Sequence, residues 1–171
     1  MEEPSNLLIA KKMGELDCEK LMHLYRGFYT NRGAQVVSQE AQSRRSLRDE
    51  EELWDFLFCD FFSGKGAGYY IRVGKNQYLS SLRLWHFQDG FLIEGLETDP
   101  DFRRQGHARY LLQTVQERIP RNTPLYAHVN RKNQASLKLH ASCGFQSYLN
   151  YARGIFGDVS SKSVTLLWEK K

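Results

Sequence analysis

An apolar strand that stops at a proline turn and leads into an amphipathic helix constrains this fold more than any other feature. The strand ends just before Pro100, and after two arginines the corner Gln105–Ala108 opens a helix expected over Arg109–Ile119. The first amide N–H groups of such a helix have no partners within it, and together with the helix dipole they favour an anion. Gly106 and Ala108 leave the backbone open to close approach. The corner therefore predicts a site for a phosphorylated ligand.

Two common phosphate-binding motifs are missing from the sequence. No run matches the Walker pattern Gly-x-x-x-x-Gly-Lys-[Ser/Thr], and a dinucleotide fingerprint needs three glycines after a strand, where this corner has one. The glycines at 64, 66 and 68 precede a strand, whereas a phosphate loop follows a strand and opens a helix. We therefore interpret these three glycines as a turn.

A second pattern lies downstream of the corner. A buried strand is expected over Leu125–Val129, and a helix is expected over Gln134–Ser142. Asn133, Ser136 and His140 are spaced i, i+3, i+7, so this helix places them along one face.

Together the two patterns resemble the signatures of the GNAT acyltransferase superfamily. The first signature, [Arg/Gln]-x-x-Gly-x-[Gly/Ala], is filled by Arg103, Gly106 and Ala108. The second, Asn-x-x-[Ala/Ser]-x-x-[Leu/Phe]-Tyr-x-x-x-Gly-Phe, is filled over Asn133–Phe145 except that His140 stands where the family has tyrosine. The two signatures occur in the family order, and the resemblance covers about residues 85–145.

The resemblance implies a fold, a cofactor and a reaction. It implies an α/β fold with one GNAT domain over residues 1–171, whose mixed central sheet has six to seven strands flanked by about four helices. The implied activity is that of an acetyl-CoA-dependent N-acetyltransferase, in which a primary amine attacks the thioester directly. The alternative is a domain of the same fold that binds acyl-CoA as a sensor or scaffold without turning it over, which the missing tyrosine permits.

The resemblance also assigns residues to acetyl-CoA. The pantetheine arm is expected along the strand Phe91–Thr98, held by backbone groups, and the loop amides are expected to hold the diphosphate. For Arg103 and Arg104 the alternative is a solvated turn, and for Asn133 it is a helix cap. The residues expected at the cofactor are Leu96, Thr98, Arg103, Arg104, Gln105, Gly106, His107, Ala108 and Asn133.

Deprotonation of the attacking amine is the larger of two proton problems. An ammonium of pKa about 10.4 loses its proton at pH 7 at a cost of roughly 4.6 kcal/mol, whereas a thiolate of pKa about 8.5 lies only about 2 kcal/mol above its thiol. Glu94 is the candidate base, because it interrupts an apolar strand and shares a face with Leu92 and Leu96. The alternative for Glu94 is an ion pair with Arg83. Glu97 is the second candidate, although it lies on the other face unless a bulge re-aims it.

His140 is the candidate acid, since it takes the place of a tyrosine that protonates the departing sulfur in many relatives. Its imidazole titrates near pH 6.5, so it is able to donate a proton if it is correctly placed. The alternative is that His140 is a spectator, because the thiolate leaves at small cost.

The remaining elements follow from apolar periodicity and from capping and turn signals. A capping box at Ser46–Asp49 is expected to start the second helix, which continues to Phe62 and stops at Ser63-Gly64. The final two strands are expected to form one hairpin around Gly157-Asp158. The expected strands are Leu7–Lys11, Tyr69–Val73, Tyr78–Trp85, Phe91–Thr98, Ser147–Ile155 and Val164–Trp168, and a first helix is expected after Asp17.

The composition of the chain limits the kinds of partner that it is expected to bind. The chain has 171 residues, 26% of them charged, and a net charge of +4 with the two signs mixed, which suits a polyanionic cofactor and gives no sign of a nucleic-acid surface. The three cysteines lack metal-ligand spacing and are typical of reduced thiols, so we expect a cytoplasmic protein without a metal. No apolar run is long enough for a membrane span. A homodimer is left open.

The acceptor amine is not specified by either motif, and we expect a small molecule rather than a protein. The resemblance implies that its pocket is shaped by the first two helices and their connection, together with the final hairpin. Five aromatic side chains either wall this pocket or, as their helical spacing favours, belong to the core: Tyr25, Phe28, Tyr29, Trp54 and Phe58.

Overall fold

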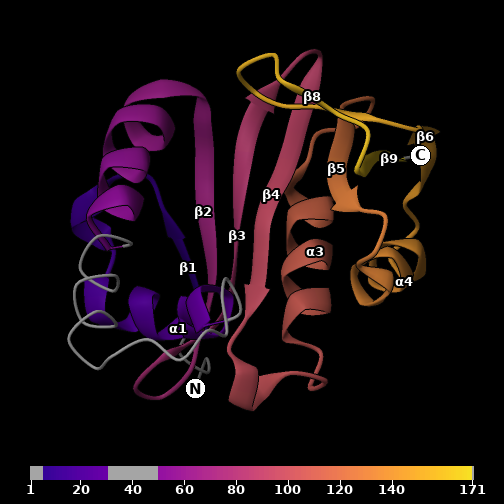
Figure 1. Ribbon diagram of the computed structural model, residues 1–171. Coiled ribbons are helices and arrows are strands. Elements are labelled where there is room, and N and C mark those ends of the chain that lie inside the picture. The colour runs from indigo at the N-terminus through magenta and orange to yellow at the C-terminus, as the bar shows by residue number, and fades with distance from the viewer. Residues whose placement is uncertain (1–5, 31–49, 171) are drawn as a thin grey trace.

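The computed structural model describes residues 6–30 and 50–170, and its centre is a seven-stranded mixed sheet (Figure 1). The strands lie in the order β1-β2-β3-β4-β5-β9-β6. β4 and β5 run parallel, and the other neighbouring pairs of this sheet are antiparallel. This arrangement confirms the predicted α/β class. The bounds are β1 Leu7–Ala10, β2 Gly66–Val73, β3 Tyr78–Phe87, β4 Gly90–Thr98, β5 Pro124–Asn130, β6 Gln146–Leu149 and β9 Ser163–Glu169.

Helices cover both faces of the sheet and create two hydrophobic cores. α3 (His107–Arg118) and α4 (Gln134–Ser142) pack against one face, whereas α1 (Cys18–Thr30) and the helical segment η2 (Phe56–Lys65) pack against the other. Successive strand residues point to opposite faces, so each strand contributes to both cores. The first core includes Leu84, Ile93, Leu111, Leu112 and Val115, and the second includes Leu21, Leu24, Phe61, Trp85 and Leu92.

Capping residues define the helix ends, as the sequence predicts. Asp17 Oδ1 accepts the amide of Lys20 at 3.1 Å at the start of α1, and Asn133 Oδ1 accepts the amide of Ser136 at 3.0 Å at the start of α4. Gly144 follows α4 with a φ of +86°, in the left-handed region that suits glycine. Two short 3₁₀ turns, η1 (Met13–Glu15) and η3 (Pro100–Phe102), complete the helical elements.

The second helix is present but differs in its geometry. Residues 50–55 are α-helical and continue directly into η2, which has π-helical hydrogen bonding. Gly64 already leaves helical φ and ψ values, and η2 ends at Lys65 rather than at Ser63-Gly64. The predicted capping box at 46–49 lies outside the described residues.

The interpretation of the glycines at 66 and 68 as a turn was wrong, because both lie inside β2. A Cβ added at Gly66 would lie 2.5 Å from the carbonyl oxygen of Phe61, so this glycine lets the strand approach η2 closely. The glycine therefore serves packing between two elements rather than chain reversal.

The final hairpin was predicted too simply. Its first arm is divided into β6 and a short strand β7 (Ala152–Arg153), and only β6 joins the main sheet, beside β9. β7 pairs with β8 (Val159–Ser160) in a separate two-stranded sheet, and Gly157 turns between them with a φ of +86°.

None of the described helices combines the length and apolar character that crossing a bilayer requires. Within the same residues, no cluster of three or more His, Cys, Asp or Glu side chains is arranged to hold a metal ion. The three cysteines are free thiols, of which Cys143 is buried and Cys18 and Cys59 are exposed.

Candidate active site

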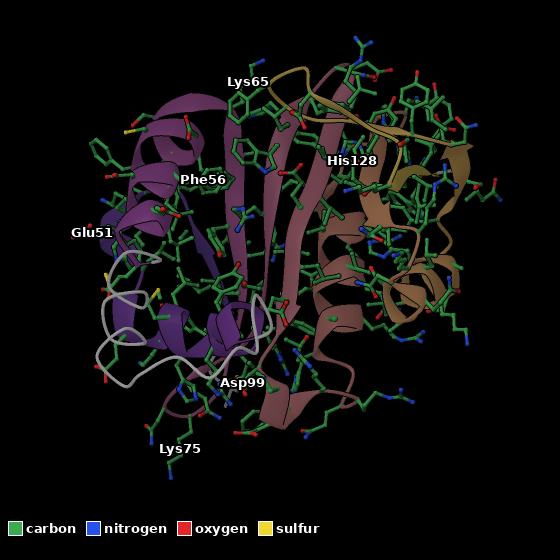
Figure 2. The ribbon with its side chains drawn as sticks, viewed as in Figure 1. Glu51, Phe56, Lys65, Lys75, Asp99 and His128 are labelled. Atoms are coloured by element: carbon green, nitrogen blue, oxygen red, sulfur yellow. The ribbon has the colours of Figure 1, made fainter. Side chains whose placement is uncertain are left out.

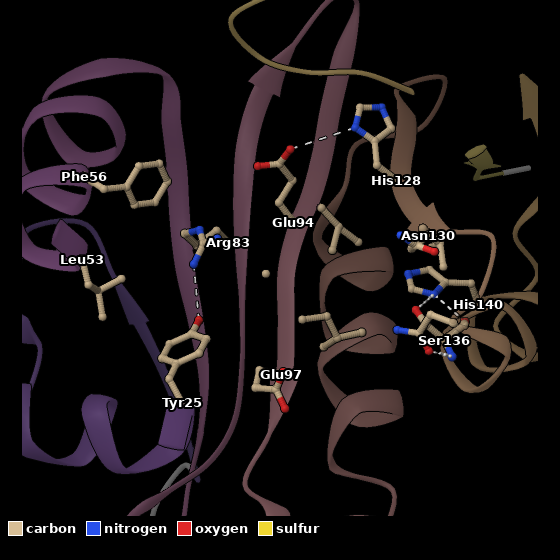
Figure 3. Close-up of a pocket in the computed structure, with 15 residues that line it drawn as sticks. Tyr25, Leu53, Phe56, Arg83, Glu94, Glu97, His128, Asn130, Ser136 and His140 are labelled. Atoms are coloured by element: carbon tan, nitrogen blue, oxygen red, sulfur yellow. Dashed lines mark hydrogen bonds and ion pairs between the residues drawn. The ribbon is translucent and has the colours of Figure 1, made fainter. Parts of the chain in front are cut away.

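The two parallel strands at the centre of the sheet separate part of the way along their length. β4 pairs with β5 only from Phe91 to Ile93, opposite Leu125 to Ala127, although both strands continue further. A pocket of about 290 Å³ lies where they separate. Its walls come from β3, β4, β5, α1, α4 and the second helix (Figure 3).

A bulge in β4 sets the direction of its acidic side chains. Glu94 is opposite Arg83 and Glu97 is opposite Ser81, so two residues of β4 face the single intervening residue of β3. Gly95 has a φ of +61° at this point. The bulge brings both Glu94 and Glu97 to the pocket.

The predicted shared face of Glu94 and Leu96 was wrong for the same reason. Leu92 belongs to the core beneath α1, whereas Leu96 packs against the core beneath α3. The extra residue at Gly95 breaks the alternation of the strand, so Leu96 changes face and Glu97 joins Glu94.

Glu94 is a half-buried carboxylate beside a histidine. Its Oε1 lies 4.0 Å from Nδ1 of His128, and 30% of its side chain is exposed. Burial raises the pKa of Glu94, and the positive charge of Arg83 offsets only part of this effect. A carboxylate with a raised pKa holds a proton more readily, which is the property that a general base needs.

The predicted alternative for Glu94, an ion pair with Arg83, is not formed. The two residues are direct cross-strand neighbours, yet in the described part of the chain no Arg83 nitrogen lies within 4.0 Å of the Glu94 carboxylate. Arg83 Nη1 instead donates to the Tyr25 hydroxyl at 3.3 Å.

Glu97 has a different environment, because a cation is bound to it. Arg103 Nη2 lies 3.1 Å from Glu97 Oε1, and Arg103 Nε donates to the carbonyl of Thr98 at 3.4 Å. This ion pair occupies one oxygen of Glu97 and ties Arg103 to the end of β4. Glu94 is therefore the more available of the two carboxylates.

His140 reaches the pocket from α4 and is 2% exposed. Its Nδ1 lies 2.8 Å from the carbonyl oxygen of Ser136, a contact that requires a proton on Nδ1, and its Nε2 is buried without a hydrogen-bond partner (Figure 3). Burial lowers the pKa of His140, and the bond to Ser136 offsets only part of this effect. The neutral ring therefore presents Nε2 as an acceptor.

Asn133 forms the predicted helix cap, while its predicted contact with the cofactor stays a prediction. It caps α4 through its Oδ1, and it also lines the pocket with Ser136 and His140. The predicted face of the helix at 133, 136 and 140 is thus the α4 wall of the pocket.

The predicted anion corner has the expected backbone shape. Gly106 precedes α3 with a φ of +85°, and no atom lies within 4 Å of where its Cβ would be. The first amide bond of the helix runs from Tyr110 to the carbonyl of Gly106 at 2.9 Å, so the amides of residues 107–109 precede the helical ladder.

The side chains of the predicted anion corner differ in how far they are exposed to solvent. Those of Arg104 and Gln105 are exposed, whereas Nε2 of His107 is buried without a partner, and burial lowers the pKa of His107. Of the predicted cofactor residues, Leu96 and Asn133 line the pocket, while Thr98, Arg103, Arg104, Gln105, Gly106, His107 and Ala108 lie outside its lining.

Several pocket residues were not among the sequence candidates for the site, and they include Leu53, Phe56, His128 and Asn130. Figure 2 shows Phe56 on η2 and His128 on β5, with β3 and β4 between them in this view. His128 interrupts the apolar β5 as Glu94 interrupts β4, and this was the available signal. For Leu53 and Phe56, an apolar residue on a helix gives no signal that distinguishes a pocket wall from the core.

The predicted aromatic wall is present only in part. Tyr25 lines the pocket, but the side chain of Phe58 is 61% exposed and Trp54 packs against the core beneath α1. The side chains of Phe28 and Tyr29 lie outside the described residues.

Comparison with known proteins gives a family and a fold. Residues 18–145 match the model of the acetyltransferase (GNAT) family, which is well over half of the chain. No curated protein sequence matches the chain.

Several solved structures have the same fold. A protein from Pyrococcus horikoshii is 15% identical with a TM-score of 0.65, covering 96% of this chain and 99% of that one. The PaiA N-acetyltransferase of Thermoplasma acidophilum, solved with coenzyme A, is 14% identical with a TM-score of 0.60 and the same coverage, 96% and 99%. The ribosomal-protein-S18-alanine N-acetyltransferase of Escherichia coli is 15% identical with a TM-score of 0.58, covering 95% and 93%. At these identities the likeness concerns the fold alone.

Proposed function

Because the chain belongs to the GNAT acetyltransferase family, we propose that it transfers the acetyl group of acetyl-CoA to a primary amine. One observation carries the proposal: where β4 and β5 separate, Glu94 and the His140 face of α4 line the same pocket. A carboxylate able to accept a proton then lies beside the place where a thioester would enter the sheet. The acceptor is a small amine that attacks the thioester directly.

The residues present fit acetyl-CoA. Beyond Ile93, β4 has no β5 partner on that side, so its backbone around Leu96 and Thr98 is available to an extended amide chain. The open backbone at Gly106 and the amides that begin α3 suit a diphosphate. Acetyl-CoA bound in this way would supply the acetyl group as a thioester at the pocket.

Glu94 has the central role in the chemistry. The amine arrives as an ammonium, and its deprotonation at pH 7 costs roughly 4.6 kcal/mol. Glu94 takes this proton directly or through a water, and its raised pKa reduces the mismatch with the amine. His128 Nδ1 lies 4.0 Å from Glu94 Oε1, beyond hydrogen-bond distance, so this carboxylate oxygen stays accessible to a proton donor.

The test is Glu94→Gln, which removes the base and keeps the shape of the side chain. We expect kcat/KM for acetyl transfer to fall about 10²- to 10⁴-fold, because the amine is no longer deprotonated, while calorimetric binding of acetyl-CoA is unchanged. Glu97→Gln is the matched control and should have the smaller effect. The assay is release of free thiol in the presence of a panel of primary amines.

The pH dependence provides a second measurement on the same variant. Glu94 must be ionised to accept a proton, so activity should fall as pH drops through its pKa. Because that pKa is raised above 4.5, this limb of the profile should lie above the range of an ordinary glutamate. Glu94→Gln should lose the limb.

The opposite results would favour the non-catalytic alternative. If the wild-type protein binds acetyl-CoA but acetylates no amine of the panel, the domain is a sensor or scaffold. If it binds no acetyl-CoA while folded, both versions of the proposal fail.

A further inference from the structure

Arg83 is a cation in the pocket that contacts no carboxylate in the described part of the chain, although Glu94 lies near it. It comes from β3 and lines the pocket beside Glu94 (Figure 3). Its Nε is buried without a hydrogen-bond partner, and no carboxylate oxygen of a described residue lies within 4.0 Å of its guanidinium. A guanidinium does not lose its proton in proteins, so the charge is permanent.

The guanidinium is held in one place by uncharged groups. Nη1 donates to the Tyr25 hydroxyl, and the guanidinium carbon lies 5.1 Å from the ring centre of Phe56 and 5.9 Å from that of Tyr69. It also covers Gly95, where an added Cβ would lie 2.5 Å from Nη2. The two aromatic rings and the Tyr25 hydroxyl fix the orientation of the guanidinium group, but they carry no charge that would neutralise it.

An enclosed positive charge without an anion is costly, and a ligand that supplies the anion removes this cost. The guanidinium fork matches a carboxylate, which it binds with two parallel hydrogen bonds. Glu94 lies directly across the strand pair, where Cβ atoms are about 5 Å apart. The pocket thus offers a cation and an anion at a spacing that suits an amino group and a carboxylate borne by one carbon.

We propose that the acceptor is an amino acid, whose carboxylate binds Arg83 while its amino group faces Glu94. This inference rests on the proposed acetyl transfer and specifies its substrate class. Leu53 and Phe56 form an apolar wall beside Arg83, so the favoured amino acids have apolar side chains. The pocket volume of about 290 Å³ accommodates a small molecule of this kind.

The experiment compares acceptors in pairs, in which one member carries an anionic group and the other lacks it. The pairs are leucine with isopentylamine and phenylalanine with phenethylamine, and phosphoethanolamine with ethanolamine tests for a phosphate instead. For the wild-type protein we expect kcat/KM to be at least about tenfold higher for each amino acid than for its amine, the size of one charge-assisted contact. Arg83→Gln should remove this preference, measured as the ratio of kcat/KM for each amino acid to kcat/KM for its amine.

Two controls separate binding from folding. Arg121→Gln makes the same charge change at an exposed position and should preserve the preference. Arg83→Lys keeps the charge without the fork, and should retain part of the preference if the guanidinium binds a carboxylate. Thermal melting of each variant reports whether it is folded.

Binding of phenylalanine and phenethylamine to the protein saturated with CoA provides a readout without turnover. A preference for phenylalanine that Arg83→Gln abolishes supports the anion site even if no acetyl transfer occurs, in which case only the transferase proposal fails. The inference is overturned if amines and amino acids bind equally, if Arg83→Gln weakens both equally, or if phosphoethanolamine alone is preferred.

Discussion

His140 shows how one substitution changes the position of a proton. A tyrosine at this position would carry its proton on the group that faces the pocket, whereas His140 donates its Nδ1 proton to Ser136 and turns an empty acceptor, Nε2, toward it. To act as an acid at Nε2 the ring must first become a cation, and burial opposes this by lowering its pKa. The geometry therefore gives His140 a smaller role than Glu94.

We expect His140→Phe to lower kcat by tenfold or less, because a thiolate leaves at a cost of only about 2 kcal/mol without a proton donor. The measurement is steady-state acetyl transfer, with His86→Phe at an exposed position of β3 as the control. A thousandfold loss would show that His140 transfers a proton in the reaction.

The site residues could be predicted from the sequence where their chemical character differed from that of the neighbouring residues or where they belonged to a motif. Glu94 stood out as a charge in an apolar strand, and Asn133 and His140 stood out through a motif. Arg83 was anticipated only as a partner of Glu94. That Arg83 forms no ion pair with Glu94 was not predictable, because its position depends on the Tyr25 hydroxyl and on aromatic rings from two other elements.

At the scale of the element, the bulge of β4 is the decisive feature. The boundaries of β4, α3 and α4 were predicted to within a few residues, because apolar periodicity and caps determine them. A bulge that re-aims Glu97 was left open as an alternative, since a glycine in a strand signals a bulge only weakly. The consequence was large, because one extra residue reversed the faces of Leu96 and Glu97.

We expect Gly95→Ala to reduce the free energy of unfolding by about 1–3 kcal/mol. Its φ of +61° is unfavourable for alanine, and the new Cβ would displace the Arg83 guanidinium. Gly157→Ala is the matched control, because Gly157 also has a positive φ but open space around it. Urea unfolding of the two variants measures the difference, and equal losses would mean that the contact with Arg83 contributes nothing.

At the scale of the whole molecule, one buried carboxylate joins two distant parts of the chain. Asp99, at the end of β4, is 0% exposed, and its oxygens lie 2.7 and 2.8 Å from the Nη atoms of Arg26 on α1 (Figure 2). The amide of Asp101 donates to the same carboxylate at 2.9 Å. The helix that supplies Tyr25 to the pocket is thereby fixed to the turn that precedes the predicted anion corner.

We expect Asp99→Ala to cost about 1–3 kcal/mol of stability, because Arg26, whose side chain is 30% exposed, loses its bidentate partner and keeps only the exposed Asp101. Burial opposes ionisation of Asp99, but the bonds from Arg26 and the Asp101 amide outweigh it and lower the pKa of Asp99. The stabilisation is therefore present above pH 3.8 and is lost as pH falls through the lowered pKa. Asp101→Ala, at a side chain 76% exposed, should cost under about 1 kcal/mol by thermal melting, and equal losses would contradict this.

Where β4 and β5 separate, part of β4 has no neighbouring strand on the β5 side, so the sheet has an edge in its interior. A strand at the outer edge of a sheet has unpaired backbone groups, which can pair with an extended segment of another chain and start aggregation. Here the unpaired part of β4 lies inside the sheet, and residues of α4 and β5 line the same pocket. A folded protein that adds a strand to the outer edge of a sheet would therefore meet α4 and β5 before it met this part of β4.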